Sequence, residues 1–321
     1  MPMHLDMERG AVLAVCPNPA WQKTLAFDNL REDKVNRAVS KQEFGGGKGV
    51  NVVRVLRRLG YPAMLGTFIG GHNGELLAKE INGSGAGLVS VEVPGETRIC
   101  TTLLNAAAHT ATEIIEPSAE IPANLVAALQ KQLQETIHAA GAVCLCGSCP
   151  PGVTADFYAA LAATARECGC PLLLDDVKTS RQVLATGGVT MLKINADELR
   201  LLMSAPAEAA VPSLAVELQK ACGLPWLGVT DGAGQAWLFG VGRAWRFDIP
   251  LVSPVISAIG CGDCAAAILT RRLLERPTPE LMPGYFAEAL GCASASCRTA
   301  IPSVFEPEQV VLPTFEELPL Q

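Results

Sequence analysis

The sequence predicts an α/β protein built on a doubly wound, mostly parallel sheet with helices on both faces, carrying a small β lid. Three observations predict this class. Short, continuously apolar runs are typical of strands buried on both faces. Amphipathic segments of helical length separate these runs, and such alternation produces a parallel sheet. Finally, 49% of the 321 residues are hydrophobic and 18% are charged, which excludes a disordered chain and supplies a large core.

The predicted strands and helices alternate along most of the chain. Apolar runs predict strands over residues 11–16, 142–146, 171–174, 191–194 and 226–229. Helical periodicity predicts helices over residues 48–59, 123–139, 154–168, 195–203 and 262–276. In the first helix, Val52, Val55, Leu56 and Leu59 share one face before Gly60, and Pro277 ends the last helix.

Two segments interrupt this alternation. Residues 24–44 and 97–116 lack helical periodicity and contain Thr- and Val-rich runs with charged neighbours. They predict a small antiparallel sheet, a lid assembled from about residues 20–44 and 95–117. The tail, residues 302–321, is rich in Pro and Glu, and we expect it to wrap the surface or fray.

Charge and composition exclude several function classes. The chain has 25 Lys and Arg against 32 Asp and Glu, a net charge of −7, and no basic run dense enough for nucleic acid or an anionic membrane. No apolar stretch reaches the 18 residues of a transmembrane helix. Residues 1–10 do not read as a secretory signal, so the twelve cysteines predict reduced thiols and a cytoplasmic protein. A small anionic ligand remains compatible with this negative net charge, because a binding pocket needs only a few local cations.

A first glycine cluster, residues 45–47, opens the predicted helix that begins near Lys48. Successive glycines let the backbone approach a ligand, and a helix N-terminus offers free N–H groups. Gly49 follows Lys48 where a Walker A loop needs Ser or Thr, so this is not such a loop. A flexible turn is the alternative, but Lys48 and Asn51 beside the glycines favour contact with a ligand.

A second cluster, Gly260-Cys-Gly-Asp263, also opens a predicted helix. With Ala265 it formally matches the dinucleotide-binding pattern G-x-G-x-x-A, yet it lies near the C-terminus and would point a carboxylate at a pyrophosphate. Phosphoryl transfer suits the pattern better, because N–H groups of the turn would stabilise the moving phosphoryl group. Asp263 would then accept a substrate hydroxyl proton. An aspartate that only caps its helix is the alternative.

The cysteines contain two C-x-x-C pairs, Cys146 with Cys149 and Cys261 with Cys264. More than a hundred residues separate the pairs, and both lie in glycine-containing turns, which argues against a zinc site or a redox pair. Reduced thiols that act as small hydrophobic groups are the expected state, with no metal bound by cysteine. The four histidines are scattered, so a Ser/His/Asp triad has no local support.

Seven short motifs follow one another along the chain. They are Cys16-Pro-Asn-Pro-Ala20, Gly45-Gly-Gly-Lys-Gly-Val-Asn51, Gly95-Glu-Thr-Arg98, Thr112-Glu-Ile-Ile-Glu-Pro117, Gly147-Ser-Cys-Pro-Pro-Gly152, Lys193-Ile-Asn-Ala-Asp-Glu198 and Gly260-Cys-Gly-Asp263. In this order they resemble the ribokinase-like (PfkB) carbohydrate kinases, particularly the branch of 1-phosphofructokinase and tagatose-6-phosphate kinase. The resemblance runs from about residue 12 to 298, so we expect residues 1–321 to form one kinase.

The resemblance implies ATP and Mg²⁺ as cofactors, a sugar phosphate under the lid, and a role for each motif. The residues implied in catalysis are the base Asp263 and the anion-hole turn Gly260, Cys261 and Gly262. Those implied in nucleotide binding are Lys193, Thr230 and Gly232, with Asn195 and Glu198 organising Mg²⁺ through water. Those implied in substrate binding are Gln22, Lys34, Gly46, Gly47, Lys48, Asn51, Arg98 and Ser148, of which Lys34, Arg98 and Ser148 hold the phosphate.

The chain also departs from the family pattern. Gln22 stands where the branch has an aspartate beside the sugar hydroxyls, and Cys261 stands where it has Ala or Ser. The expected function is ATP-dependent phosphorylation of a sugar phosphate, with a homodimer through the lid implied by analogy. A kinase for an unphosphorylated sugar or a nucleoside is the alternative, which Lys34 and Arg98 oppose because two covered cations need an anion. Gln22 and Cys261 favour a third hypothesis, in which the protein is a catalytically weak sugar-phosphate sensor.

Overall fold

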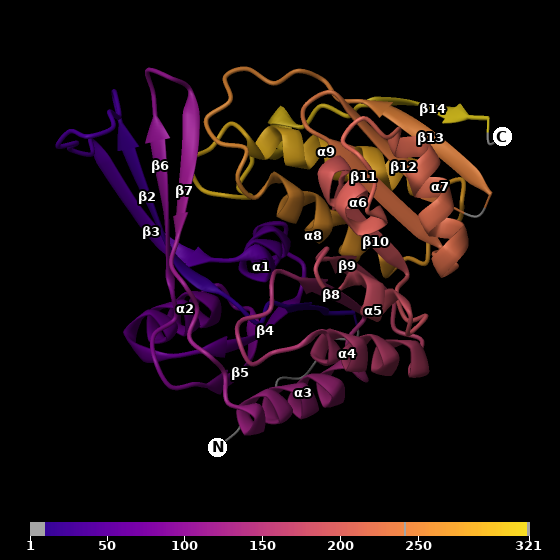
Figure 1. The fold of residues 1–321 in the computed structure, drawn as a ribbon, viewed down its shortest axis with the longest axis horizontal. Coiled ribbons are helices and arrows are strands. Elements are labelled where there is room, and N and C mark those ends of the chain that lie inside the picture. Colours follow the sequence, from indigo (N-terminus) through magenta and orange to yellow (C-terminus); the bar gives the residue numbers. More distant parts are fainter. Residues whose placement is uncertain (1–9, 241, 320–321) are drawn as a thin grey trace.

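The computed structural model describes residues 10–240 and 242–319, and its largest element is a ten-stranded sheet (Figure 1). Seven neighbouring strands of this sheet run parallel. In spatial order they are β11 (Trp226–Asp231), β10 (Met191–Asn195), β9 (Leu172–Asp175), β8 (Ala142–Cys146), β1 (Val12–Val15), β4 (Ala63–Ile69) and β5 (Gly87–Glu92). The five apolar runs that predicted strands all lie in this parallel part.

Helices cover both faces of the sheet, as the prediction of a doubly wound fold requires. Core residues on one face come from α1 (Lys48–Arg58), α2 (Gly71–Gly83), α8 (Cys261–Leu273) and α9 (Met282–Ser296). Core residues on the other face come from α3 (Ala123–Ile137), α4 (Ala155–Glu167), α5 (Ser180–Leu184), α6 (Ala196–Met203) and α7 (Val211–Cys222). The predicted fold class is confirmed.

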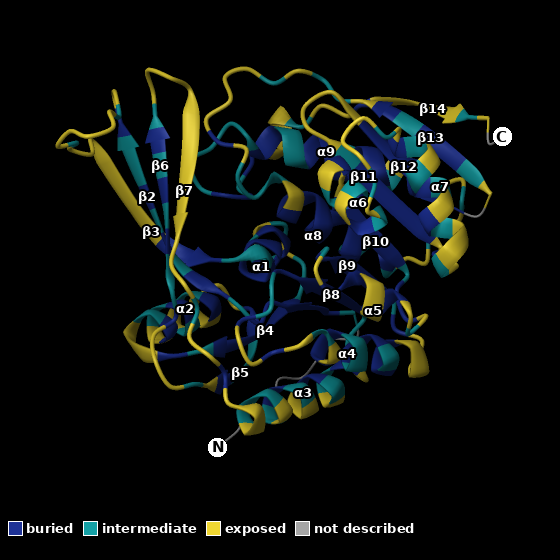
Figure 2. Cartoon of the chain, in the orientation of Figure 1, coloured by how far each residue is buried: buried dark blue, intermediate teal, exposed yellow. Residues whose placement is uncertain are grey.

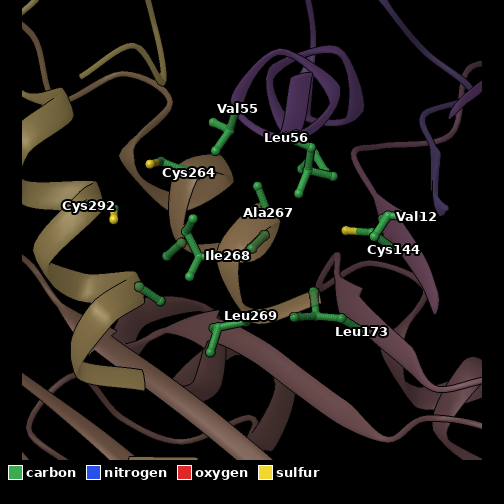
Figure 3. Close-up of a cluster of buried hydrophobic side chains, with 14 of the residues drawn as sticks. Val12, Val55, Leu56, Cys144, Leu173, Cys264, Ala267, Ile268, Leu269 and Cys292 are labelled. Carbon is green, nitrogen blue, oxygen red and sulfur yellow. The ribbon is translucent and has the colours of Figure 1, made fainter. Parts of the chain in front are cut away.

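Helix α8 packs at the centre of the sheet face that is covered by α1, α2, α8 and α9. Ala267, Ile268 and Leu269 of this helix point into a cluster that includes Leu56 of α1 and Leu173 of β9 (Figure 3). Every one of these five side chains is buried. Because α8 packs on both α1 and the sheet, the N-termini of α1 and α8 are held at a fixed distance from the strand ends.

Of the two behaviours expected for the tail, the structure shows the first, because the tail runs along the surface and adds a strand to the edge of the large sheet. After the 3₁₀ turn η1 (Pro307–Gln309), β14 (Thr314–Leu318) pairs with the edge strand β13 (Arg243–Asp248), which continues the antiparallel meander from β12 (Gln235–Gly240). Glu316 and Glu317 of the tail pair with Arg246 and Arg243 at 2.9 and 2.7 Å. The acidic residues of the tail therefore have partners on β13 rather than only solvent.

A separate four-stranded sheet projects from the body (Figure 1). Its order is β3 (Ser40–Gly46), β2 (Ala20–Phe27), β6 (Ile99–Asn105) and β7 (Thr110–Ile115). The central pair, β2 and β6, is parallel, whereas an antiparallel sheet was expected. The parallel pairing arises because the two segments are separate hairpins that each leave the body in the same direction. The outer strand β7 is exposed along its whole length (Figure 2).

Within residues 10–240 and 242–319, no helix combines the length and the apolar composition needed to cross a membrane.

Candidate active site

Polar side chains gather where the strand order of the large sheet reverses. Strands β1 and β8 are neighbours, but the chain passes from β1 towards β4 and β5 on one side and from β8 towards β9, β10 and β11 on the other. Loops that follow the strands part at such a point and leave room for a ligand. Asn18 follows β1 and Ser148 follows β8, and the Asn18 amide donates to the Ser148 hydroxyl at 3.4 Å. The Ser118 hydroxyl donates to Asn18 Oδ1 at 2.7 Å.

Arg98 joins this polar group from the start of β6. Its Nη2 donates to the Asn18 carbonyl at 3.1 Å and its Nε to the Pro19 carbonyl at 3.4 Å. The half-buried guanidinium keeps its Nη1 without a hydrogen bond to any described residue. Asn18 was quoted from the sequence only within a motif, and the structure adds it to the site. Its position shortly after a buried strand was the sequence feature that could have identified Asn18 as a site residue.

The first glycine cluster spans the end of β3 and the turn into α1, with Gly45 and Gly46 in the strand and Gly47 at the helix N-cap. Gly47 has a φ of 107°, and a Cβ there would lie 3.2 Å from both Cys16 Sγ and Pro19 Cα. Only glycine fits such a turn without strain. The turn thus places Lys48 and Asn51, in the first helical turn of α1, beside the loop that follows β1.

The second glycine cluster forms the N-terminus of α8. Gly260 is the N-cap, with a φ of 82°, and a Cβ there would lie 2.7 Å from Pro302. The Ser303 hydroxyl donates to the Gly260 carbonyl at 2.7 Å, so the segment after α9 holds this turn. Asp263 lies in the first turn of α8, where free N–H groups and the helix dipole favour a negative charge.

Asp263 is buried and meets α1 through Asn51. The Asn51 amide Nδ2 donates to Asp263 Oδ2 at 2.7 Å, although 212 positions separate the two residues in the sequence. Burial raises the pKa of Asp263 above its ordinary value, and the charge of Lys48 and the Asn51 hydrogen bond oppose that rise only in part. A carboxylate with a raised pKa is a stronger proton acceptor, as a general base needs to be.

Asp175, at the end of β9, bridges two lysines beside Asp263. Its Oδ1 lies 2.7 Å from Lys48 Nζ and its Oδ2 lies 3.2 Å from Lys193 Nζ. Burial alone would raise the pKa of Asp175, but the positive charges of Lys193 and Lys48 outweigh it and lower that pKa. Sequence reasoning did not select Asp175, although an acidic residue that ends a buried strand was a signal available to it.

Lys193 also lies against the α8 turn. It comes from β10 and is almost completely buried, and a Cβ placed on Gly262 would lie 3.2 Å from its Nζ. The glycine therefore lets a lysine ammonium group approach the N-terminus of α8. A cation beside free helix N–H groups is suited to hold a phosphate group.

A second hydrogen-bond network fixes the amide oxygen of Asn51. Arg54 Nη1 donates to Asn51 Oδ1 at 2.5 Å, and Arg54 Nη2 donates to Glu80 Oε1 at 3.0 Å and to the Gly45 carbonyl. Because Arg54 occupies the amide oxygen, the amide nitrogen of Asn51 is the group turned towards Asp263. Sequence reasoning missed Arg54 and Glu80. The spacing of three residues between Asn51 and Arg54 on one helix was the signal.

Asn195 and Glu198 form a capping box at the N-terminus of α6. The Glu198 N–H donates to Asn195 Oδ1 at 2.8 Å and the Asn195 N–H donates to Glu198 Oε2 at 2.9 Å. Glu198 keeps Oε1 without a hydrogen bond to any described residue. Nearby, Thr230 ends the parallel part of the sheet in β11, and Gly232 lies in the following turn with a φ of 61°. All four lie at the carboxyl edge of β10 and β11.

Two further predicted substrate residues belong to the small sheet and its connections. Gln22 is buried in β2, donates to the Thr102 hydroxyl at 2.8 Å and lies against Gly46, where a Cβ would be 2.9 Å from Gln22 Cβ. Lys34 is exposed in the connection between β2 and β3. Arg98 lies at the start of the paired β2 and β6, and Lys34 lies beyond their other end, about 20 Å along the strands at about 3.3 Å per residue. The structure therefore does not bring Lys34 to Arg98.

A model of one protein family matches almost the whole chain. Residues 11–306 match the model described as pfkB family carbohydrate kinase. The chain is also similar to three solved structures, which show the same fold. Phosphofructokinase-2 from Escherichia coli in complex with potassium is 20% identical, with 94% of this chain and 97% of that chain covered and a TM-score of 0.84.

The second is a protein of Thermotoga maritima described as a possible 1-phosphofructokinase. It is 20% identical, with 96% of this chain and 100% of that chain covered and a TM-score of 0.83. The third is Arabidopsis thaliana ribokinase complexed with ribose and ATP. It is 19% identical, with 94% of this chain and 98% of that chain covered and a TM-score of 0.71.

Proposed function

This chain belongs to the pfkB family of carbohydrate kinases and is an ATP-dependent kinase, and from that premise we propose that it phosphorylates a hydroxyl group of a sugar phosphate. The observation that carries the proposal is the hydrogen bond between Asn51 and Asp263 at 2.7 Å. It unites the two glycine-rich helix N-termini at one point, with Lys48 and Lys193 beside it. A proton acceptor and phosphate-binding groups therefore face the same space.

In this proposal Asp263 accepts the proton of the attacking hydroxyl group. Its buried position raises its pKa, and the Asn51 amide fixes the direction of its carboxylate. The N–H groups of Gly260 and Gly262, which donate to no backbone carbonyl of the described residues, stabilise the negative charge of the transferring phosphoryl group, whereas the Cys261 N–H donates to the Ala258 carbonyl at 3.3 Å. Lys193, beside Gly262, binds the same group from the sheet side.

The residues near β10 and β11 fit the nucleotide and its magnesium ion. Glu198 is partly exposed and has one carboxylate oxygen without a hydrogen bond to any described residue, and Mg²⁺ prefers such oxygen ligands while it keeps part of its water shell. We assign Asn195 and Glu198 to that ion through water, and Thr230 and Gly232 to the nucleotide. When bound, the ion supplies positive charge that neutralises the phosphates of ATP.

The group around Asn18 fits the phosphate already present on the substrate. Arg98 has an Nη1 that donates to none of residues 10–240 and 242–319, and Ser148 has a hydroxyl at the same switch point. Gly46, Gly47, Lys48 and Asn51 are assigned to the sugar, because Gly47 lies against the loop after β1 and Asn51 contacts Asp263. Gln22, which lies against Gly46, is assigned with them. Arg98 is the cation on which the proposal rests, and a contact of Lys34 with the same phosphate stays a prediction from the family resemblance.

Replacing Arg98 with alanine tests the phosphate subsite. We expect kcat/KM for the best sugar phosphate to fall by about 2–4 kcal/mol, because one partner of a desolvated charged pair is lost. Slow ATP hydrolysis without sugar should remain nearly unchanged, since the nucleotide residues lie on other strands. Arg98→Lys should recover part of the loss, because the ammonium group keeps the charge without the two-pronged geometry. An unchanged kcat/KM in Arg98→Ala would remove the residue from the subsite.

Replacing Arg54 with alanine tests the network behind the base. Without Arg54 the Asn51 amide is free to rotate, and the hydrogen bond that favours ionised Asp263 weakens. The pKa of Asp263 then rises further, so the acid limb of the kcat profile should move to higher pH, with kcat at neutral pH about tenfold lower. Arg57→Ala is the matched control, because Arg57 lies on the same helix and contacts Tyr61 and Ser84 instead. Equal pH profiles in the two variants would reject the positioning role.

A further inference from the structure

Two thiols meet at the proposed phosphoryl-binding turn, and they are not a C-x-x-C pair. Cys261, the first residue of α8, has its Sγ 3.0 Å from Sγ of Cys297, which follows α9. Its sequence neighbour in the motif, Cys264, points instead into the buried core (Figure 3). Both Cys261 and Cys297 are partly exposed. The thiol of the turn is therefore paired with a thiol 36 positions away.

The approach of the two sulfur atoms is fixed by the backbone around them. The Cys297 carbonyl accepts hydrogen bonds from the N–H groups of Ile256 and Ser257 at 2.8 and 3.1 Å. These residues lead directly into the turn that begins at Gly260, whose carbonyl is held by Ser303. The C-terminus of α9 and the segment after it thus hold the turn from two sides. A disulfide needs a sulfur separation of about 2.05 Å, so closure requires a movement of about 1 Å.

We propose that Cys261 and Cys297 are a site of reversible oxidative modification, at which disulfide formation displaces the phosphoryl-binding turn and switches the enzyme off. The disulfide itself is argued from the thiol geometry, whereas its effect on activity rests on the proposed function. Cys261 lies between Gly260 and Gly262, so its movement also moves their N–H groups, and a displacement of about 1 Å in a catalytic group can cost about a hundredfold in rate.

The chemistry needs a two-electron oxidant, and a hydroperoxide supplies it. The Cys297 thiolate attacks one peroxide oxygen, the O–O bond breaks, and a sulfenic acid and water result. The Cys261 sulfur then attacks that sulfenic sulfur, the S–S bond forms, and the S–O bond breaks to release a second water. In sum, two thiols are oxidised and one hydrogen peroxide is reduced to two waters. The hydrogen bond from the Cys261 thiol lowers the pKa of Cys297, which suits Cys297 to the first step.

The experiment treats the full-length protein with hydrogen peroxide and digests it, without reduction, with trypsin and an aspartate-specific protease. Cleavage before Asp263 separates Cys261, in residues 248–262, from Cys264, in residues 263–271. Cys292 and Cys297 stay together in residues 273–298. We expect a disulfide-linked pair of residues 248–262 with 273–298 by mass spectrometry. We also expect kcat to fall about ten- to a hundredfold and to recover with dithiothreitol.

Two variants decide which thiols react. Cys297→Ser should keep the activity of the reduced protein, lose the linked peptide and resist peroxide. Cys292→Ala, the matched change on α9, should still form the link. No linked peptide in the wild type, or a linked peptide with unchanged kcat, would overturn the proposal. A reduced protein without kinase activity would contradict the proposed function alone, because the linked peptide is scored independently of activity.

Discussion

Asp263→Asn is expected to lower kcat by about 10²–10⁴-fold, the range that a general base contributes. The asparagine keeps the size of the side chain but cannot accept the hydroxyl proton. Nucleotide affinity should stay within a few-fold, because Lys193, Glu198 and Thr230 lie on other elements. Steady-state kinetics with the best sugar substrate, together with nucleotide binding by calorimetry, measure the two effects separately.

The control for this variant is an aspartate of the same chain outside the site. Asp248 is exposed at the end of β13, so Asp248→Asn should leave kcat unchanged. The thermal midpoints of both variants should remain close to that of the wild type. An Asp263→Asn protein that is folded and retains near-normal kcat would remove Asp263 from the mechanism.

Asp175→Ala is expected to lower the free energy of unfolding by about 3 kcal/mol. The change leaves Lys193, which is buried, without its anionic partner, and breaking a buried pair by removing one member costs about 3–5 kcal/mol. The lower end applies because 36% of the Lys48 side chain is exposed to solvent. Urea denaturation at neutral pH measures the loss, with Asp156→Ala, an exposed aspartate on α4, as the control.

The same carboxylate predicts how stability depends on pH. Its pKa in the folded state is lowered below the ordinary value of 3.8. Its contribution is therefore complete above that ordinary value and is lost as the pH falls through the lowered one. Wild type and Asp175→Ala should accordingly converge in stability in strong acid and differ fully near neutral pH. A loss below 1 kcal/mol at neutral pH would contradict the buried ion pair.

The parts of the fold predicted well from the sequence were those with a local signal. Buried parallel strands are continuously apolar, and the turn from Gly260 to Asp263 is one short motif at a helix start. The tail was harder, because β14 is exposed on most of its residues and depends on Arg243 and Arg246 of a distant strand. The parallel pairing of β2 with β6 could not be predicted from the sequence either, because pairing between two separate hairpins leaves no local pattern.

Single candidate residues of the site were selected from the sequence, but the hydrogen bond and the ion pairs that join them were not predicted. Asn51, Lys193 and Asp263 were each selected from their own motif, whereas the bonds that unite them depend on packing between α1, α8 and the sheet. Asp175 stayed unselected because its two lysine partners come from different elements. Cys261 was weighed against Cys264, three residues away, yet a helix carries that neighbour towards the core and leaves Cys297 as the partner.

The measurement that tests the central claim most directly is ATP turnover by the purified full-length protein on matched pairs of sugars. The pairs set fructose 1-phosphate, fructose 6-phosphate and tagatose 6-phosphate against fructose and tagatose, with ribose and a nucleoside added. We predict that one ketohexose phosphate gives a kcat/KM at least about thirtyfold above every unphosphorylated compound, as the loss of about 2 kcal/mol of phosphate contacts implies. Faster turnover of an unphosphorylated sugar or nucleoside would contradict the account, and so would tight binding of a sugar phosphate without turnover, the behaviour of a sensor.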